Sequence, residues 1–384
     1  MAQQHLDPTD PAAARPSPPD PGRAGGAATG DALAGYLRAQ ATEFLRALRL
    51  HRETGSGQNG TEESVDAARA LRRSARRISG SLHTFRPLLD SDWSEEMRPE
   101  LAWLSGTLAL EHACAARLER LLLALHRLSG SAAFPAQSAA SAVGGRVTGA
   151  GRGIPAPAGA RTPGTGPATT PTATAERGNL TVGAAKAGAL LERQLTLART
   201  RAHSTALQAL GSSRFHAVAD KVAVLASEVP LTPAAATAEL RPLATAAGER
   251  LTDAVTALPL VTAGHPYNAE ALIHGLSPDP APHPQDGPWH QVRLLLRLHR
   301  YAGEVLHGDG APTDVRLLAA GQALNLHRDA SEAAAAAASA ARTPRIAPAT
   351  AYALGVLHAD QRHEVEAARF AFQQSWQKQA VGTP

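Results

Sequence analysis

The sequence predicts an all-α fold, a duplicated helical bundle of two similar multi-helix halves with basic helices lining a central surface. Apolar residues recur with the helical period of about 3.6 residues in most segments. No segment shows the sustained period-2 alternation of β-branched residues that a strand requires. A basic helical pattern near residue 70 returns near residue 290, and two similar helices at this separation favour a duplicated architecture.

The first basic helix is expected over residues 63–85, because Pro87 cannot continue it. Apolar residues at helical spacing predict one buried seam, made of Leu71, Ala75, Ile78, Leu82 and Phe85. A polar stripe with the same period lies beside this seam and comprises Arg69, Arg72, Arg76, Ser79, His83 and Arg86. Residues 69–86 contain no acid, and like charges at i, i+4 destabilise a helix. A polyanion, or carboxylates from another helix, must therefore balance these cations.

The second basic helix is expected over residues 289–306. Its polar stripe repeats the spacing of the first and comprises His290, Arg293, Arg297, Arg300 and Glu304. The adjoining apolar seam is predicted to comprise Leu294, Leu298, Tyr301 and Val305. Arginine suits a phosphate better than lysine does, since its planar fork donates two parallel hydrogen bonds. Both basic helices carry only arginine and histidine as cations.

The rest of the chain divides into tail, helices and linker. Residues 1–28 are expected to be a disordered tail, and 129–178, rich in Ala, Gly, Pro and Thr, a disordered linker. The first half, 29–128, is predicted to hold helices at 32–52, 63–85 and 93–128, with Asp31 capping the first. The second half, 179–380, has a loop at 259–288 and helices at 182–210, 214–226, 235–257, 289–306, 313–341 and 349–379.

Composition limits the compartment and the partners. Cys114 is the single cysteine, so no intramolecular disulfide can form and a reducing compartment is favoured. The N-terminal sequence lacks the charged start and apolar core of a signal peptide, and no apolar run approaches the roughly 20 residues that span a bilayer. We therefore expect a cytoplasmic protein that does not enter a membrane. The pI near 9.6 fits an anionic partner, although the net charge of +4 is modest and its clustering matters more.

Two sets of residues resemble the CHAD family, the conserved histidine α-helical domain. The first set comprises Arg72, Arg76-Arg77, Thr84-Phe-Arg-Pro-Leu-Leu89 and Glu100-Leu-Ala-Trp-Leu104. The second set comprises Trp289-His290, Arg293, Arg297, Arg300-Tyr301, Glu304, Ala353-Leu-Gly-Val-Leu-His358 and Trp376. The resemblance covers about 30 to 380, apart from the linker. It implies a duplicated helical bundle whose basic residues bind inorganic polyphosphate, a binding or targeting module associated with polyphosphate granules.

The residues expected to bind polyphosphate are the cations of the two helices and one tyrosine. They are Arg69, Arg72, Arg73, Arg76, Arg77, His83, Arg86, His290, Arg293, Arg297, Arg300 and Tyr301. The sequence departs from the family pattern where Arg69-Ala70 replaces His-Asp, where His112-Ala113 replaces Arg-Asp, and where Asn325 replaces a glycine. These departures indicate a divergent member and make the second basic helix the better candidate for the site.

Other functions find less support in the sequence. No phosphate-binding loop, His-Glu-x-x-His motif or paired cysteines occur, and Glu364-Val-Glu366 lacks the lysine of a triphosphate hydrolase signature, so it is interpreted as a solvated face. We therefore expect no catalysis, no metal and no cofactor; a weak phosphohydrolase is the distant alternative. Aromatic residues are only 4%, which disfavours specific recognition of single-stranded nucleic acid but leaves non-specific binding open.

Another alternative is a helical scaffold for a protein partner, in which the arginines pair with carboxylates of neighbouring helices. The sequence leaves open whether the protein is a homodimer and whether both halves contact one polyphosphate chain.

Overall fold

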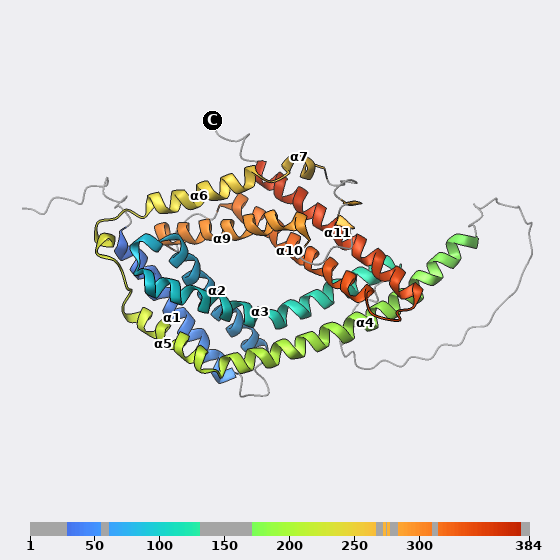
Figure 1. Cartoon of the computed structure of the whole chain (residues 1–384), viewed down its shortest axis with the longest axis horizontal. Helices are drawn as coiled ribbons and strands as arrows, with labels where there is room; N and C mark the ends of the chain where they lie inside the picture. Colours follow the sequence, from blue (N-terminus) through green and yellow to red (C-terminus); the bar gives the residue numbers. More distant parts are fainter. Residues whose placement is uncertain are drawn as a thin grey trace, which may run out of the picture.

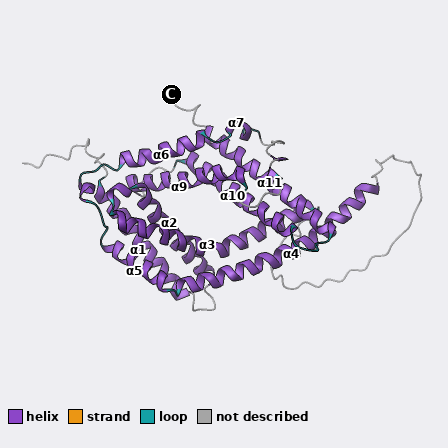
Figure 2. Ribbon diagram, in the orientation of Figure 1, coloured by secondary structure: helices purple, strands orange, loops and turns teal. Residues whose placement is uncertain are grey.

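The computed structural model describes residues 29–54, 61–130, 171–265, 272–273, 275–276, 283–308 and 314–377. Most of these residues lie in helices. Figure 1 shows long helices crossing and packing side by side, and Figure 2 shows no strand in this described part. A single antiparallel bridge joins Leu89 to Leu231. The all-α prediction is confirmed. No described helix is long and apolar enough to cross a membrane.

The first three helices are α1 (Gly30–Thr54), α2 (Thr61–Thr84) and α3 (Ser91–Leu128). The predicted cap at Asp31 was wrong, because α1 already begins at Gly30 and Asp31 lies in its first turn. Asp90 caps α3, since its carboxylate accepts a hydrogen bond from the backbone N–H of Trp93 at 2.9 Å. Pro87 lies in the short 3₁₀ turn η2 (Arg86–Leu88) that follows α2, as the predicted end of that helix required.

The later helices carry the second basic stripe and the C-terminal half of the fold. They are α4 (Pro171–Leu210), α5 (Ser213–Ser227), η3 (Pro233–Ala236), α6 (Arg241–Thr256), α7 (Leu260–Ala263), η4 (Pro284–Asp286), α9 (Gly287–His307), α10 (Val315–Ala341) and α11 (Pro348–Gln377). Helix α6 starts later than predicted, because the residues from Pro233 form a separate 3₁₀ turn. Helix α4 starts within the range predicted for the linker. Residues 1–28 and 131–170 of the expected tail and linker lie outside the described residues.

Three apolar clusters bury the inner faces of these helices. The first joins α1, α2, α3, α5, α6 and α9, and Phe44, Phe85 and Phe215 are among its fully buried members. The second joins α3, α4, α10 and α11, and the third joins α6, α7, α9, α10 and α11 around Trp289 and Phe372. The first two clusters therefore draw helices from both predicted halves, whereas the third lies within the second half. The duplication itself stays a prediction.

Helix α2 buries the seam that its periodicity predicts, and all five of its residues from Leu71 to Phe85 are inaccessible to solvent. On α9, Tyr301 and Val305 are buried as predicted, but Leu294 is 42% exposed. Helix α9 packs against α6, α2 and α10 instead of along one narrow seam. Its buried face is therefore broader than predicted and includes Trp289 and Val292, while Leu294 falls outside it.

Gly80 allows α2 and α9 to approach closely. A Cβ atom added there would lie 2.6 Å from Cδ2 of Tyr301 and 3.3 Å from Cδ2 of Leu298, so the Tyr301 ring occupies the space of the missing side chain. Both neighbours are buried parts of α9. The absence of a side chain at Gly80 thus brings the two basic helices together.

We expect Gly80→Ala to lower the free energy of unfolding by about 1–3 kcal/mol, because the added methyl displaces the buried Tyr301 ring. Thermal and urea unfolding followed by circular dichroism measure this. The control is Gly106→Ala on the exposed side of α3, where a new Cβ meets nothing within 4 Å and improved helix propensity should stabilise by up to about 1 kcal/mol. Stabilisation by both substitutions would contradict the close approach at Gly80.

Candidate anion-binding site

Arginines from three helices gather where α2, α9 and α10 meet. Arg72 and Arg76 come from α2, Arg293 and Arg297 from α9, and Arg328 from α10; we call these five residues the cationic cluster. The helix packing brings α9 against both α2 and α10. Arg76 of the first predicted stripe therefore lies near Arg293 and Arg297 of the second, and Arg328 of α10 lies close to all three.

The arginines of the cluster are close enough to shift one another's pKa. Burial, the largest cause, and the positive charges of Arg76 and Arg328 together lower the pKa of Arg72 to about 10. Burial and the charges of Arg297, Arg328 and Arg76 likewise lower the pKa of Arg293 to about 9. These values stay above neutral pH, so the cluster remains charged. Positive charge is thus concentrated in a half-buried setting where solvent screens it poorly.

Carboxylates neutralise only a part of the cationic cluster. Among the described residues, Arg72, Arg76 and Arg297 form no ion pair, and Arg293 donates its Nε to the side-chain oxygen of Asn325 at 2.8 Å. The Nε atoms of Arg72 and Arg297 are buried without a hydrogen-bond partner in the protein. Buried donors are normally satisfied, so these two require an acceptor.

Arg328 is the member of the cluster that does bind acids. It hydrogen-bonds to Asp329 and lies 3.8 Å from Glu332. Glu332 also accepts from Nη2 of Arg117 on α3 at 2.5 Å. Both acids therefore sit at the α10 edge of the cluster and form no ion pair with the four arginines of α2 and α9, although the charge of Asp329 reaches Arg293.

Glu304 forms ion pairs with Arg77 and Arg300 at one end of the two stripes. Its carboxylate accepts from Nε of Arg77 at 2.7 Å and from Nη2 at 3.3 Å, and also from the hydroxyl of Tyr36 at 2.9 Å. Nε of Arg300 lies 3.5 Å away. Burial lowers the pKa of Arg77, but the hydrogen bond that it donates to Glu304 and the negative charge of that carboxylate together outweigh burial and raise the pKa. Arg77 and Arg300, both expected to bind phosphate, are thus already paired.

Tyr301 lies beneath the cations as a buried ring. The guanidinium carbons of Arg77 and Arg300 lie 5.9 Å and 5.2 Å from its centroid, within the range of a cation–π contact. The side chain is only 5% exposed. The Tyr301 ring therefore packs beneath the guanidinium groups of Arg77 and Arg300 and supports them.

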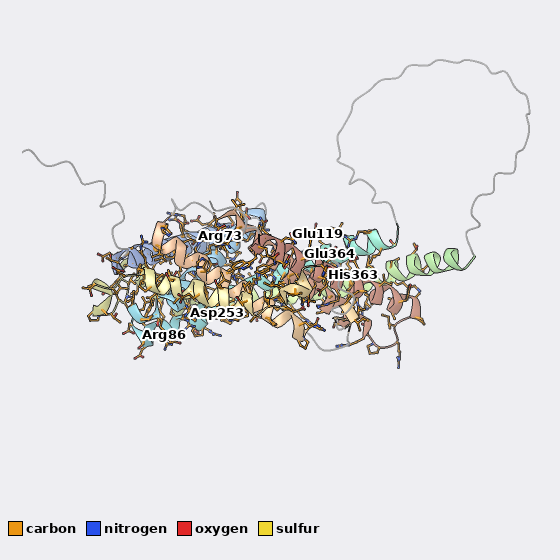
Figure 3. All side chains as sticks on the ribbon, turned by 90° about the horizontal axis from the view of Figure 1, so that it is seen from above. Arg73, Arg86, Glu119, Asp253, His363 and Glu364 are labelled. Carbon is orange, nitrogen blue, oxygen red and sulfur yellow. The ribbon has the colours of Figure 1, made fainter. Side chains whose placement is uncertain are left out.

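The remaining predicted site residues lie away from the centre of the cluster. Arg69 is exposed and pairs with Asp66 at 3.0 Å, and its charge still reaches Arg72. Burial lowers the pKa of His83, and Arg98 and Arg250, which are not cluster members, lower it further. Arg86 pairs with Glu95 at 3.0 Å. Figure 3 shows Arg73 and Arg86 toward opposite edges of the molecule.

His290 borders the cluster on α9. Burial lowers its pKa, Asp286 opposes this, and Arg293 lowers the pKa further. Its ring packs edge-on against His327 with the centroids 5.4 Å apart. His290 is thus mainly neutral at pH 7.

Comparison with known proteins identifies the family of this chain. Residues 39–338 match the CHAD domain. The chain belongs to the CHAD domain family. A solved structure, PptA from Streptomyces chartreusis, is similar with 69% identity and a TM-score of 0.70, covering 91% of this chain and 99% of that one. No curated protein matches the chain.

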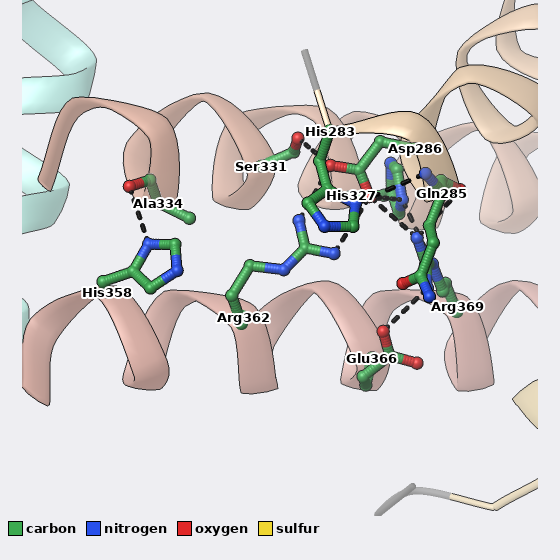
Figure 4. A network of polar contacts seen from close by, with 10 residues as sticks. All are labelled: His283, Gln285, Asp286, His327, Ser331, Ala334, His358, Arg362, Glu366 and Arg369. Carbon is green, nitrogen blue, oxygen red and sulfur yellow. Dashed lines mark hydrogen bonds and ion pairs between the residues drawn. The ribbon is translucent and has the colours of Figure 1, made fainter. Parts of the chain in front are cut away.

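A buried polar network fixes the start of α9 in this CHAD protein, as Figure 4 shows. Asp286 is inaccessible to solvent and accepts from Nη1 of Arg362 at 2.8 Å and Nη2 of Arg369 at 2.7 Å. Burial alone raises its pKa, but the hydrogen bonds from Arg362 and Ser331 outweigh it and lower the pKa to about 2. The network thereby ties η4, at the head of α9, to α10 and α11.

Some residues of the cationic cluster and of the buried network were not predicted from the sequence. Arg328 was not predicted as a site residue, because the neighbouring Asp329 suggests that its charge is neutralised locally within an alanine-rich helix. The interpretation of Glu366 as solvated was wrong, since it is 4% exposed and accepts from Nη1 of Arg369 at 2.7 Å. The pair Arg362 and Arg369, which lies on one face of the last helix, was the signal that could have revealed its burial.

We expect Asp286→Asn to cost about 3–5 kcal/mol of folding free energy, because it leaves the buried cations Arg362 and Arg369 without their ionised partner. Urea unfolding followed by circular dichroism measures the loss. The matched control is Asp253→Asn at an exposed position of α6, which should change stability by less than about 0.5 kcal/mol. Equal effects of the two substitutions would show that the network contributes no special stability.

Proposed function

We propose that this protein binds inorganic polyphosphate at the cationic cluster and acts as a binding or targeting module without catalysis. Membership of the CHAD family fits polyphosphate binding in general. The observation that carries the proposal is the convergence of Arg72, Arg76, Arg293 and Arg297 without carboxylate partners among the described residues. A ligand with many negative charges supplies what the protein itself does not.

The chemistry of the cluster matches a phosphate chain. Each guanidinium can donate two parallel hydrogen bonds to phosphate oxygens, and charge-assisted bonds of this kind are about twice as strong as neutral ones. The buried Nε atoms of Arg72 and Arg297 would gain acceptors. Because the cations come from several helices, one polyphosphate chain would contact both predicted halves of the bundle. The proposed setting is the cytoplasm, in association with polyphosphate granules.

Nucleic acid is the weaker alternative ligand for this surface. Non-specific binding of single strands uses aromatic side chains on which bases stack. Trp289 and Tyr301, the aromatic residues of α9, are 1% and 5% exposed and pack inside the protein. The phosphates of a nucleic acid can still be attracted to the cluster, but with no stacking platform on α9.

The scaffold alternative has support outside the cluster. Several arginines do pair with acids of neighbouring helices, as Arg117 does with Glu332 and Arg127 with Asp360 at 3.0 Å. These pairs join α3 to α10 and α11 and hold the helices together. The unneutralised arginines of α2 and α9 have no such role, and this difference favours anion binding there.

We expect the double substitution Arg293→Gln and Arg297→Gln to weaken binding of long-chain polyphosphate by about 100-fold, because each lost charge-assisted contact costs about 1.5 kcal/mol or more. The slope of log affinity against log salt should fall by about 1.4. Titration at several salt concentrations, with double-stranded DNA as competitor, measures both quantities.

The matched control removes two exposed cations elsewhere, Arg193→Gln and Arg201→Gln on α4. It should leave the affinity within about twofold, since these charges lie outside the cluster. No binding by the wild-type protein, or equal losses in the two double variants, would overturn the proposed function.

Polyphosphate binding is expected to strengthen as the pH falls from 8 to 6. Burial lowers the pKa of His290 in the free protein, so it is neutral there, and a bound polyanion raises this pKa. Binding then takes up a proton, which lower pH favours. His290→Gln should flatten the pH dependence, whereas His83→Gln, a control in a different charge environment, should retain it. Equal wild-type affinity at pH 6 and pH 8 would argue against a role for His290.

A further inference from the structure

Glu304 lies where the stripe of unneutralised arginines ends. It is the acid of the second basic helix and sits one turn beyond Arg300. Its side chain is 26% exposed, so it remains accessible at the edge of the site. Three side chains from three helices converge on it: Tyr36 of α1, Arg77 of α2 and Arg300 of α9.

The contact with Arg77 uses the same atoms that a phosphate would use. Nε of Arg77 donates to one carboxylate oxygen of Glu304 and Nη2 donates to the other, at 2.7 Å and 3.3 Å. This two-point contact is the geometry by which arginine holds carboxylates and phosphates alike. Arg77 therefore cannot present this edge of its guanidinium to a phosphate while Glu304 occupies it.

The end of the stripe at which Glu304 lies borders directly on the cationic cluster. The ring of Tyr301 lies between them, because it sits under Arg77 and Arg300 and also influences the pKa of Arg76 and Arg297. An anion on Arg76 and Arg297 therefore has Arg77 and Arg300 as its next cations. At that point the negative carboxylate of Glu304 competes with the anion for Arg77 and Arg300.

We propose that Glu304 is an internal competitor of the phosphate chain, which withholds Arg77 and Arg300 and so limits the affinity and the length of chain that the site engages. This inference rests on the proposed function. An orienting role for Glu304 predicts the opposite sign, because loss of an orienting partner weakens binding. The sign of one substitution therefore distinguishes the two roles.

Glu304→Gln removes the competing charge while it keeps the size of the side chain and an oxygen that accepts from the Tyr36 hydroxyl. We expect affinity for long-chain polyphosphate to rise about 5- to 20-fold and the salt slope to increase by about 0.7–1.4, as one or two further cations bind phosphate. The charge control is Glu100→Gln, which breaks the exposed pair with Arg214 between α3 and α5 and changes the net charge equally. It should leave both quantities unchanged.

A second pair of variants locates the gain. Adding Arg77→Gln to Glu304→Gln should cancel most of the increase, while adding Arg193→Gln, an exposed cation of α4, should preserve it. Thermal unfolding of each variant shows whether the fold is retained. If the wild-type protein binds no polyphosphate, the proposed function itself fails. If it binds but a folded Glu304→Gln variant binds equally or more weakly, only the competitor role of Glu304 is overturned.

Discussion

Electrostatic repulsion among the arginines of α2, α9 and α10 is the constraint that the structure has to overcome. Two unit charges a few ångströms apart repel by several kcal/mol in a partly desolvated setting. The protein holds these charges together through apolar packing, in which the missing side chain at Gly80 lets the ring of Tyr301 fit against α2. The stability that the cores provide is thus partly used to concentrate charge. Like charges that packing holds together in this way are typical of a site that binds an anion.

The protein treats buried cations in two different ways. Arg362 and Arg369 share the carboxylate of Asp286, and all three of these side chains are buried. Arg72 and Arg297 instead keep a buried Nε without a partner and remain half-buried at the surface. The first arrangement is closed and serves the fold. The second is open, and this contrast within one molecule separates structural arginines from those available to a ligand.

The sequence predicted the helices and the buried face of α2 because these depend on local periodicity. The seam from Leu71 to Phe85 is such a case, since helical spacing alone determines it. What it could not predict depends on partners distant in the chain. The pairing of Arg77 with Glu304 joins residues of α2 and α9, and the burial of Glu366 follows from helices packing around α11. The place of Arg328 in the cluster was not predicted for a related reason, because only the packing of three helices brings it there.

Helix α9 belongs to two apolar cores at once. Trp289, Val292 and Leu296 near its start lie in one core, while Ala302 and Val305 near its end lie in another. The helix therefore cannot move away from α2 to relieve the repulsion without opening both cores together. The repulsion of like charges is thus held in place by two cores. A polyanion that relieves this repulsion would therefore also stabilise the bundle, because a ligand that binds only the folded state raises the free energy of unfolding.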